Sequence, residues 1–355
     1  MFSLFIFQNF NLLTYIYRKL IQMKKLKWGI LSTSGFSRRK MIPALLHCRH
    51  ASVYAVASRD ISRGREFAAE FNIPVVYGDY MDLLNDKEID VIYNPLPNHL
   101  HKEWTIKAME HGKHVLCEKP LALSLSDVRE MIEVRDRYNV KAGEAFMVKT
   151  HPQWLRVKEI VVSGRLGQLQ MIHGFFSYFK DDPDNIRNIA EYGGGSLWDI
   201  GCYCTMLSRF ILNAEPTRVM ALIDFDKKFK TDRLVSAILD FKDVQVSFTS
   251  ATQLVPYQRM QFFGTKKMLE VQIPFNSPPD SPSVLIIDDG DLLSANHEKV
   301  IIDPCNQYTI EGNAFSLAIL ENKDVPSSFE DAYKNIAVLK ALFRSAETNS
   351  WETVN

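Results

Sequence analysis

The stretch GKHVLCEKPLA, from Gly112 to Ala122, decides the fold of this 355-residue chain. Residues 115–117 form an apolar run that is typical of a buried strand, and a charged triplet at 118–120 follows at its carboxyl end. In an open α/β sheet, ligands bind in the crevice outside the carboxyl ends of the strands. Lys119 therefore stands where a side chain can take part in chemistry. A solvated Glu-Lys pair at a strand end is the plainer alternative, and the surrounding sequence must decide between the two.

On both sides of this stretch, short apolar runs alternate with segments of helical pattern. Strands that alternate with helices predict a parallel, doubly wound sheet of the Rossmann type. We expect this α/β domain to occupy residues 23–147 and to bind a dinucleotide. Its predicted strands are 26–31, 53–57, 75–77, 91–93 and 115–117, and its predicted helices are 38–48, 62–71, 81–85, 101–111 and 126–138.

The sequence pattern changes after about residue 150. Long alternating runs follow one another with few helices between them, which predicts a largely antiparallel sheet. We therefore expect residues 148–355 to form a C-terminal α+β domain with a large, mostly antiparallel sheet. The predicted strands are 169–179, 218–225, 234–241, 244–252, 258–263, 268–273, 284–287 and 299–302, and the predicted helices are 152–162, 306–321 and 330–347.

The composition is that of an ordinary soluble globular protein, with 46% hydrophobic and 24% charged residues. The 42 Lys and Arg residues balance the 42 Asp and Glu residues, so nothing suggests a surface for nucleic acid or for an anionic membrane. Five cysteines without a CxxC pair indicate neither a disulfide framework nor a zinc site. We expect a reduced, cytoplasmic compartment, no metal and no nucleic-acid partner.

The first 22 residues stand apart from both domains. Residues 1–17 are rich in Phe, Leu and Ile and carry no charge, but polar side chains at positions 8, 9 and 11 make their apolar run short for a membrane span. No basic leader region and no small-residue cleavage site precede Arg18. Met23 opens Met-Lys-Lys-Leu-Lys, which would suit a chain start. We expect residues 1–22 to be a disordered extension or to precede the true start, with a membrane anchor as the alternative.

The turn after the first strand is the first candidate cofactor site. In a dinucleotide-binding element, glycines let the backbone approach the pyrophosphate at the helix N-terminus. Here serines at positions 32, 34 and 37 stand where the glycines of G-x-G-x-x-G would fall. Serine is small and its hydroxyl can donate to phosphate, so the turn can still bind cofactor, although a plain structural turn is equally compatible. The candidates are Ser32, Thr33, Ser34, Gly35 and Phe36.

The ends of later strands carry further cofactor candidates. An acidic residue at the end of the second strand would bind the ribose of NAD, whereas an arginine there accommodates the 2′-phosphate of NADP. Ser58 and Arg59 fit NADP, since a guanidinium is a phosphate fork, and Asp60 keeps NAD possible. NADP is therefore the preferred cofactor and NAD the alternative. After the fourth strand, two prolines hold a segment extended, and its candidates are Asn94, Pro95, Leu96, Asn98 and His99.

A second glycine-rich segment, GGGSLWDIGCY from Gly193 to Tyr203, leads into a predicted helix. Three successive glycines lose much conformational entropy on folding, and they suit a place where the backbone passes close to another group. Asp199 and Tyr203 are four residues apart and therefore share one helix face. A carboxylate and a phenol on one face can form an acid/base pair, or equally a surface hydrogen bond.

Together, these segments resemble the Gfo/Idh/MocA family, the group of glucose–fructose oxidoreductase and inositol dehydrogenase. The resemblance runs from about Lys25 to Trp351. The chain is most similar to the branch of NADP-linked D-xylose dehydrogenases and dimeric dihydrodiol dehydrogenases, which also has Tyr, and not His, four residues after the motif aspartate. Five pieces in the family's order carry the resemblance: NPLPNHLHKEW (94–104), GKHVLCEKPLA (112–122), EAFMVKTHPQ (144–153), DPDNIR (182–187) and GGGSLWDIGCY (193–203).

The resemblance implies a hydride transfer between the nicotinamide and a polyhydroxy substrate, such as an aldose or a cyclic sugar or diol. Lys119 matches the family's lysine beside the nicotinamide and the substrate hydroxyl, Tyr203 matches the proposed acid/base, and Asp199 matches the residue that positions substrate or tunes this pair. An unperturbed phenol has a pKa of about 10. We expect the Lys119 ammonium to lower the pKa of Tyr203 and to stabilise the developing alkoxide.

The same resemblance implies further contacts. Glu118 matches a cofactor-contacting position, as do the strand-end residues Asn94 and His99. Lys149 stands where many relatives have arginine, which keeps the charge but loses the bidentate geometry. The C-terminal domain is implied to bind substrate and to form a homodimer or a higher homo-oligomer. The implied substrate-binding residues are Lys119, Glu144, Lys149, Arg187, Asp199 and Tyr203.

Two other functions stay open at this point. Some family members are dinucleotide-binding regulators or sensors without turnover, although the presence of both Lys119 and Tyr203 disfavours that function here. Some relatives use bound NAD to cleave glycosides, and these keep the dinucleotide through the cycle. Net release of NADPH during turnover would separate an oxidoreductase from a glycoside-cleaving enzyme.

Overall fold

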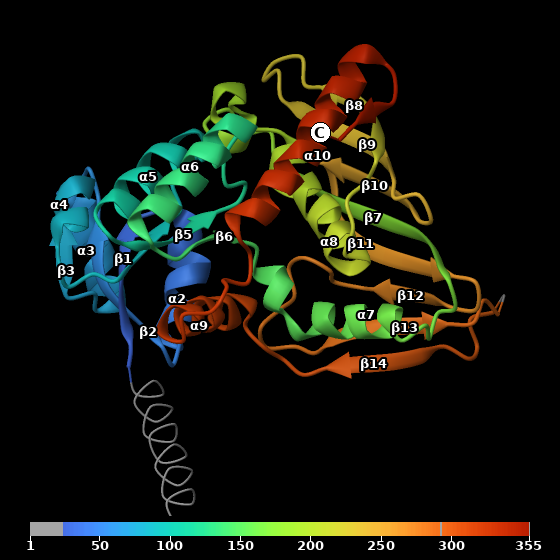
Figure 1. The fold of residues 1–355 in the computed structure, drawn as a ribbon, viewed down its shortest axis with the longest axis horizontal. Coiled ribbons are helices and arrows are strands. Elements are labelled where there is room, and N and C mark those ends of the chain that lie inside the picture. Colours follow the sequence, from blue (N-terminus) through green and yellow to red (C-terminus); the bar gives the residue numbers. More distant parts are fainter. Residues whose placement is uncertain (1–23, 292, 355) are drawn as a thin grey trace, which may run out of the picture.

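The computed structural model describes residues 24–291 and 293–354, and in these residues the chain forms two sheets that lie side by side (Figure 1). The expectation for residues 1–22 concerns a segment outside the described part of the chain. Within the described ranges, no helix has the length and apolar character needed to cross a membrane.

The first sheet is parallel throughout, with the strand order β3-β2-β1-β4-β5-β6. The strand order reverses beside β1, so the ends of β1 and β4 flank the switch point at which sheets of this type bind ligands. The predicted Rossmann sheet is thereby confirmed. Its strands are β1 (Leu26–Leu31), β2 (Ala51–Ala57), β3 (Val75–Tyr77), β4 (Val91–Asn94), β5 (His114–Glu118) and β6 (Ala142–Ala145).

The helices of this half lie between the strands, as the sequence predicted. The first of them differs in detail, because the predicted helix over 38–48 consists of a π-helical turn, η1 (Ser37–Met41), followed by α2 (Ile42–Leu46). Pro43 lies at the start of α2. Proline has no N–H to donate, so it fits the first turn of a helix and not the interior. The others are α3 (Ile61–Phe71), α4 (Tyr80–Asn85), α5 (His101–Glu110) and α6 (Leu125–Tyr138).

The second sheet has nine strands in the order β14-β13-β12-β11-β7-β10-β9-β8-β15. Every neighbouring pair is antiparallel except β7 and β10. The predicted mostly antiparallel sheet is confirmed, with one parallel pair added. The strands are β7 (Leu169–Phe179), β8 (Arg218–Phe225), β9 (Asp232–Asp240), β10 (Gln245–Ala251), β11 (Gln253–Gly264), β12 (Met268–Val271), β13 (Ser283–Asp288), β14 (Glu298–Ile302) and β15 (Glu352–Thr353).

Strand β11 starts at Gln253, whereas the sequence predicted a start at Gln258. Pro256 interrupts the predicted pattern, because proline cannot donate to a sheet ladder. In the structure, the pairing of β11 with β7 is irregular between Gln253 and Tyr257, so this proline lies in a bulge and the strand continues through it.

Helices α7 (Pro152–Val162), α8 (Cys202–Leu212), α9 (Gln307–Leu320) and α10 (Phe329–Thr348) belong to the second half of the chain. The last two return to the first sheet, since α9 packs against α2 and β2, while α10 packs against α6 and β6 as well as against β8 of the second sheet (Figure 1). Gly143 in β6 allows this approach, because a Cβ there would lie 2.9 Å from the Ser327 carbonyl oxygen. The segment between α9 and α10 therefore lies directly on the edge of the first sheet.

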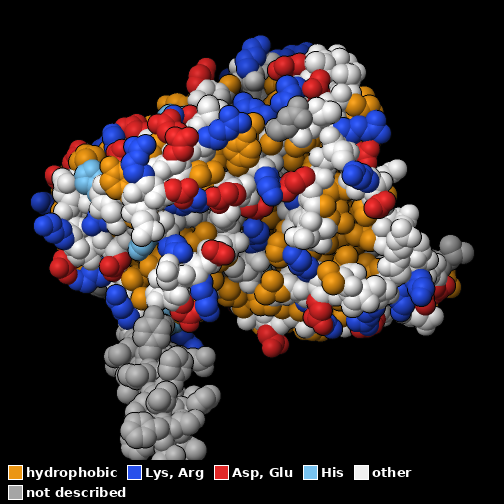
Figure 2. Space-filling model, viewed as in Figure 1, with side chains coloured by type: hydrophobic (Ala, Val, Ile, Leu, Met, Phe, Trp, Pro, Cys, Tyr) orange, Lys and Arg blue, Asp and Glu red, His pale blue; other side chains and the backbone are white. Residues whose placement is uncertain are grey.

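Buried apolar side chains join the two sheets into one core, which contains Trp28 and Phe67 from the first half and Phe248 and Phe262 from the second. On the surface, Lys and Arg side chains are interspersed with Asp and Glu over the face shown in Figure 2. This mixing agrees with the balanced charge of the sequence.

Candidate active site

A cavity of about 1020 Å³ lies at the carboxyl ends of β1, β4 and β5, and residues of the second sheet and α8 form its other wall. Eleven of the predicted site residues line it: Ser34, Gly35, Phe36, Pro95, Leu96, Asn98, Glu118, Lys119, Arg187, Asp199 and Tyr203. The structure does not bring the other eight to its wall: Ser32, Thr33, Ser58, Arg59, Asn94, His99, Glu144 and Lys149.

The turn after β1 is held by its own serines. The Ser34 hydroxyl accepts a hydrogen bond from the Ser37 backbone N–H at 3.0 Å and lies 2.7 Å from the Ser37 hydroxyl. These side chains therefore cap the start of η1 and are engaged with each other. Gly35 and Phe36 line the cavity beside them, and so does Arg39, whose guanidinium folds over Gly35.

The segment after β4 divides into structural and cavity-facing residues. Asn94 is fully buried and donates to the His101 carbonyl at 3.2 Å and to the Thr105 hydroxyl at 3.1 Å, so it holds the start of α5. Asn98 reaches across to the second half and donates to the Gly193 carbonyl at 3.0 Å. His99 stacks on Tyr192, with 4.0 Å between ring centroids. This segment thus fastens the two walls together at the mouth of the cavity.

Ser58 and Arg59 follow β2 at some remove from the cavity wall. The Ser58 hydroxyl accepts from the Asp60 backbone N–H at 3.3 Å. The Asp60 carboxylate caps α3 by accepting from the backbone N–H groups of Ser62 and Arg63 at 3.0 and 3.2 Å. Asp60 is therefore engaged by the helix, while the Arg59 side chain is exposed to solvent.

The ends of β4 and β5 are locked together around Glu118. The Tyr93 hydroxyl donates to the Glu118 carboxylate at 2.5 Å, and burial raises the pKa of Glu118 above its ordinary value. The two ring nitrogens of the buried His101 lie 2.8 Å from the Pro120 carbonyl and 2.7 Å from the Leu96 carbonyl. These contacts fix the backbone on both sides of Lys119.

Lys119 and Asp199 meet across the cavity as an ion pair. The Lys119 ammonium lies 3.2 Å from Asp199 Oδ1 and also donates to the Asp199 backbone carbonyl. The other carboxylate oxygen accepts from Arg187 Nε and from the Tyr178 hydroxyl, each at 2.7 Å. Burial alone would raise the pKa of Asp199, but Arg187 and Lys119 outweigh it and lower that pKa. Asp199 is therefore ionised, and it joins two cations from opposite walls.

Tyr203 stands in an apolar surrounding beside this ion pair. Its hydroxyl donates to the sulfur of Met147 at 3.6 Å, and its ring packs edge-on against Phe146 and Phe176. Burial raises the pKa of Tyr203 well above its ordinary value, and the neighbouring Tyr308 acts in the same direction. The phenol therefore holds its proton at neutral pH.

The expectation that Lys119 lowers the pKa of Tyr203 is wrong in this structure. The Lys119 ammonium lies over the face of the Tyr203 ring, 5.0 Å from the centroid, and its charge is directed at Asp199. Burial favours the neutral amine, but the Asp199 carboxylate more than offsets it, and the pKa of Lys119 is raised. In this structure Lys119 is therefore favoured as the ammonium and Tyr203 as the neutral phenol.

The three glycines before η6 (Leu197–Gly201) allow the backbone to pass close to other groups, as the sequence predicted. A Cβ on Gly194 would lie 2.5 Å from the Arg187 carbonyl oxygen, and one on Gly195 would lie 1.8 Å from an oxygen of Asp232. Gly195 also has a φ of 111°, which L residues with side chains rarely adopt. The absence of side chains on these glycines therefore lets the Arg187 segment pack directly beside the start of η6, which carries Asp199 and leads into α8 with Tyr203.

Glu144 and Lys149, both expected to bind substrate, lie behind the cavity. Glu144 is buried in β6, where one carboxylate oxygen accepts from the Leu121 backbone N–H at 2.8 Å. Lys149, in η3 (Met147–Thr150), pairs with Asp331 of α10 at 2.7 Å. The sequence placed both residues correctly in a motif next to the cavity, but it could not tell which side of the chain each would face.

Among the lining residues that the sequence analysis did not name, three hold or charge the site. Tyr178 binds Asp199, and its alternation with the lining residue Phe176 along β7 could have revealed it. Arg39 stands in the predicted helix after the serine turn, where a cation suits a phosphate. His101 gave no signal, because its role depends on two backbone carbonyls that only the fold brings together.

The donors at this site fit a nicotinamide dinucleotide. The turn after β1, the amide of Asn98, and the charges of Arg39, Glu118 and Lys119 lie along one cavity at the switch point of the sheet. In the described ranges, no cluster of three or more His, Cys, Asp and Glu side chains could hold a metal ion.

Comparison with protein families gives two matches. A model described as an oxidoreductase family with an NAD-binding Rossmann fold matches residues 26–146, and a model of the GFO/IDH/MocA C-terminal domain matches residues 154–270. The first match covers the whole first sheet, and the second covers β7 to β11 and most of β12 of the second sheet.

Several known proteins are similar over most of the chain. An uncharacterised oxidoreductase of Rhizobium meliloti is 41% identical over 94% of this chain and 100% of its own length. A D-xylose 1-dehydrogenase (NADP+) of Haloferax volcanii is 33% identical over 91% of this chain and 98% of its own length. A trans-1,2-dihydrobenzene-1,2-diol dehydrogenase of Xenopus laevis is 31% identical over 69% of this chain and 74% of its own length. These matches confirm the branch expected from the sequence.

Among solved structures, a 3-ketoreductase of Actinomadura kijaniata, in complex with NADP and TDP-benzene, superposes with a TM-score of 0.85. It is 26% identical in sequence, and the match covers 91% of this chain and 98% of that one.

Proposed function

The chain belongs to the Gfo/Idh/MocA family of oxidoreductases, and on that premise we propose that it transfers a hydride between the nicotinamide of NADP and a carbon of a sugar-like polyhydroxy substrate. The substrate class is an aldose, a cyclic sugar or a diol. Relatives named for D-xylose and for a cyclic diol support this class.

One observation carries the proposal. Lys119, from the end of a Rossmann strand, forms an ion pair with Asp199 from the opposite wall, beside the buried phenol of Tyr203. A cation, a fixed carboxylate and a protonated phenol at the mouth of a dinucleotide fold suit the chemistry of a carbon that bears a hydroxyl or a carbonyl.

NADP is the proposed cofactor, with NAD as the alternative. NAD binding would need an acidic group at the end of β2. The acidic group there, the Asp60 carboxylate, is already engaged in capping α3. Arg59 next to it is exposed and able to meet a 2′-phosphate. In the cavity, Arg39 and the Gly35 turn would face the pyrophosphate, while Glu118 would face the nicotinamide half. The NADP-linked relatives point the same way.

When bound, the cofactor accepts or donates a hydride at C4 of its nicotinamide. In carbonyl reduction, the Lys119 ammonium stabilises the negative charge that develops on the substrate oxygen. The Tyr203 phenol then gives its proton to that oxygen. In oxidation the same steps run backwards, and Tyr203 must first lose its proton. Asp199 and Arg187 hold Lys119 in place and contact the other hydroxyls of the substrate.

A substrate screen tests the proposal. Aldoses, cyclic sugars and diols are incubated with NADP and with NAD, and the absorbance of the reduced cofactor is followed. We expect net NADPH formation with at least one polyol, faster than NADH formation, and a large loss of turnover in Lys119→Met. Near-normal turnover of Lys119→Met would sink the mechanism. Tight dinucleotide binding without any net NADPH would instead favour a regulator or a glycoside-cleaving enzyme.

We also propose a cytoplasmic homodimer or higher homo-oligomer without nucleic-acid or membrane partners. The face of the nine-stranded sheet that α8 and α10 leave uncovered carries exposed apolar side chains, including Met220, Leu222 and Ile238, and it supports self-association. All five cysteines are free, and four of them are buried, which suits a reducing compartment.

A further inference from the structure

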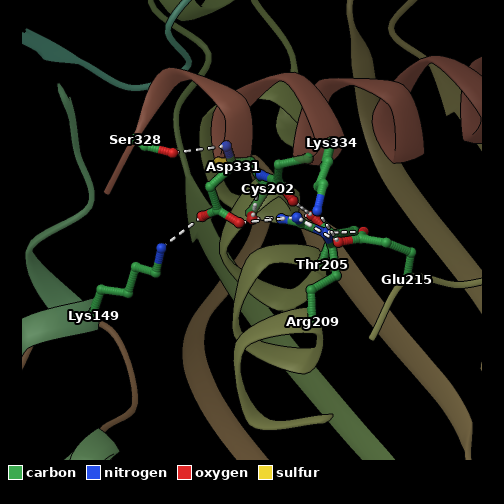
Figure 3. A network of polar contacts seen from close by, with 9 residues as sticks. Lys149, Cys202, Thr205, Arg209, Glu215, Ser328, Asp331 and Lys334 are labelled. Carbon is green, nitrogen blue, oxygen red and sulfur yellow. Dashed lines mark hydrogen bonds and ion pairs between the residues drawn. The ribbon is translucent and has the colours of Figure 1, made fainter. Parts of the chain in front are cut away.

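Behind the cavity lies a group of charged side chains, here called the rear cluster. It consists of the buried Glu144 and Arg209, the half-buried Lys149 and Asp331, and the exposed Glu215. None of the five lines the cavity. Figure 3 shows most of this group, with Asp331 of α10 facing Lys149 on one side and Arg209 of α8 on the other.

Asp331 is the centre of the rear cluster. One carboxylate oxygen lies 2.7 Å from Lys149 Nζ, and the other lies 2.9 Å from Arg209 Nη2. Burial would raise the pKa of Asp331, but Arg209 and Lys149 outweigh it and lower that pKa, so the carboxylate is ionised. The Ser328 hydroxyl caps α10 by accepting from the Asp331 backbone N–H at 3.3 Å, which fixes the position of the carboxylate (Figure 3).

Each cation of the rear cluster belongs to a segment that also carries an active-site residue. Lys149 lies in η3 together with Met147, whose sulfur contacts the Tyr203 hydroxyl. Arg209 lies in α8, the helix that carries Tyr203, and its side chain is only 3% exposed. The Asp331 carboxylate therefore joins η3 and α8, the two segments that carry the acceptor, Met147, and the donor, Tyr203, of this hydrogen bond.

A second contact ties α8 to α10 close by. The Asn335 side chain donates to the Cys202 carbonyl at 3.2 Å, and its oxygen accepts from the Thr205 hydroxyl at 2.8 Å. Both contacts lie within one turn of Tyr203. Helix α10 therefore contacts the start of α8 through Asn335 and a later turn of α8 through Asp331.

Glu144 extends the rear cluster to the Lys119 loop. One of its oxygens accepts from the Leu121 backbone N–H, two residues after Lys119, while the other is buried and has no hydrogen-bond partner in the described part of the chain. Arg209 Nη1 is likewise buried without a partner there. The charges of Asp331, Lys149 and Arg209 all act on Glu144, so these groups share one electrostatic environment.

The charges of the rear cluster balance when Glu144 is neutral. Lys149 and Arg209 supply two positive charges, and Asp331 and Glu215 supply two negative ones. Loss of the Asp331 charge would leave Lys149, 14% exposed, without its ion-pair partner and Arg209, 3% exposed, with only the solvent-exposed Glu215, and an uncompensated charge with so little access to water is costly.

We propose that Asp331 is a positioning residue for the reaction: through Lys149 and Arg209 it holds the Met147 turn and the Tyr203 helix in register, so that the phenol faces the substrate oxygen. The inference rests on the proposed function of Tyr203 as proton donor. It also assigns Lys149 to this support role, in place of the substrate contact expected from the sequence.

Asp331→Asn tests the role. The matched control is Glu330→Gln, at the neighbouring residue of α10. Glu330 pairs at 2.6 Å with Arg135, which is not part of the rear cluster, so this substitution removes one ion pair of similar kind. We expect Asp331→Asn to lower kcat by roughly 10- to 100-fold with the KM for NADP unchanged, and Glu330→Gln to keep kcat. The alkaline limb of the oxidation profile should also move to lower pH, because a loosened phenol is better solvated.

Lys149 provides a gentler version of the same test. Lys149→Met should lose activity as Asp331→Asn does, whereas Lys149→Arg, which keeps the charge and can reach Asp331, should restore it. This pair decides the question if Asp331→Asn does not fold. Equal kcat in wild type and Lys149→Met, or an equal loss in Glu330→Gln, would overturn the proposal.

Hydrogen exchange separates this proposal from the proposed function. In the full-length protein without substrate, Asp331→Asn should speed amide exchange in residues 147–150 and 202–209, and Glu330→Gln should not. If wild type turns over no polyol but amide exchange in these residues is faster in Asp331→Asn, the proposed function is wrong and the positioning role of Asp331 stands. Unchanged exchange in an active enzyme would overturn the positioning role alone.

Discussion

At the scale of single residues, the surroundings of Tyr203 determine its protonation state. The rings of Phe146, Phe176 and Phe275 lie with centroids 5.2, 5.9 and 5.6 Å from that of Tyr203. An apolar surrounding disfavours the charged form of a phenol. Tyr203 therefore keeps its proton through the neutral range, so in the proposed reaction the proton is in place for carbonyl reduction and the phenol can act as a base only at high pH.

The first prediction concerns Tyr203→Phe and the pH profiles of wild type. The variant should lose roughly 10²- to 10⁴-fold in kcat while its dissociation constant for NADP stays unchanged. In wild type, polyol oxidation should rise with pH up to the alkaline range, because the phenol must lose its proton first, and carbonyl reduction should fall over the same range. Steady-state rates in both directions from pH 6 to 10 would measure this. Tyr138→Phe, at an exposed tyrosine of α6, is the control.

The second prediction concerns the stability contributed by Glu144. Burial raises its pKa to about 8, against roughly 4.3 in an unfolded chain. Between these values the unfolded chain has released a proton that the folded protein keeps, so this group makes the folded state less stable as pH rises, by up to about 1.4 kcal/mol per pH unit. Above about pH 8 the loss levels off.

Glu144→Gln should remove this pH dependence. Glutamine does not ionise, and its amide oxygen can still accept from the Leu121 N–H. The variant should match wild type near pH 4.5 and exceed it in free energy of unfolding at pH 8, as measured by urea denaturation at both values. A difference of the same size at the two pH values would contradict the assignment.

At the scale of elements, the sequence predicted most strands and helices because their patterns are local. Strand β7 and helix α7 have the predicted bounds, since alternation and a proline at the helix start are signals within one segment. The parallel pair of β7 with β10 could not be predicted, because it joins segments whose pairing depends on the path of α8, β8 and β9 between them. Register between distant strands is a property of the whole sheet.

The candidate site was predictable to a similar degree. Lys119, Asp199 and Tyr203 were expected to lie together, and they do. Lys119 follows the apolar run of a strand, and Asp199 and Tyr203 follow the glycine-rich segment, so local sequence patterns place each of them. Glu144 and Lys149 were misplaced, since their partners Leu121 and Asp331 come from other segments. The sequence shows which residues are neighbours along the chain. Which partner from a distant segment pairs with a charged side chain is known only from the fold.

The third prediction concerns the glycine segment before η6. A methyl group on Gly194 would stand 2.5 Å from the Arg187 carbonyl oxygen, a backbone atom that can yield only if its segment moves. Because Arg187 Nε lies 2.7 Å from Asp199, such a movement would separate the pair that holds Lys119. Gly194→Ala should therefore lower kcat about tenfold or more. Gly78→Ala, where the nearest heavy atom would be 3.8 Å away, should keep wild-type kinetics, and a fully active Gly194→Ala would refute this account.

At the scale of the whole molecule, the candidate active site lies between the two sheets. The first sheet supplies Lys119 and the cofactor turn, while the second half supplies Asp199, Arg187 and Tyr203. Contacts such as Asn98 with Gly193 join the two halves of the chain at the cavity mouth. On the face of the nine-stranded sheet away from α8 and α10, Met220, Leu222 and Ile238 do not line the cavity, which leaves this apolar patch available for another role.

The fourth prediction concerns that uncovered face. Met220 of β8 pairs with Ile238 of β9 across the ladder, and Leu222 next to them is 76% exposed. In a sheet with one solvent-exposed face, apolar and polar residues normally alternate along each strand. Contiguous apolar side chains on the exposed face therefore mark an interaction site. We therefore expect wild type to sediment as a dimer or larger oligomer at micromolar concentration. The double variant Leu222→Lys/Ile238→Lys should sediment as a monomer and keep its kcat, because neither residue lines the cavity. Val162→Lys, at an exposed apolar position of α7, should leave the oligomer intact, and a monomeric wild type would show that this face has a different use.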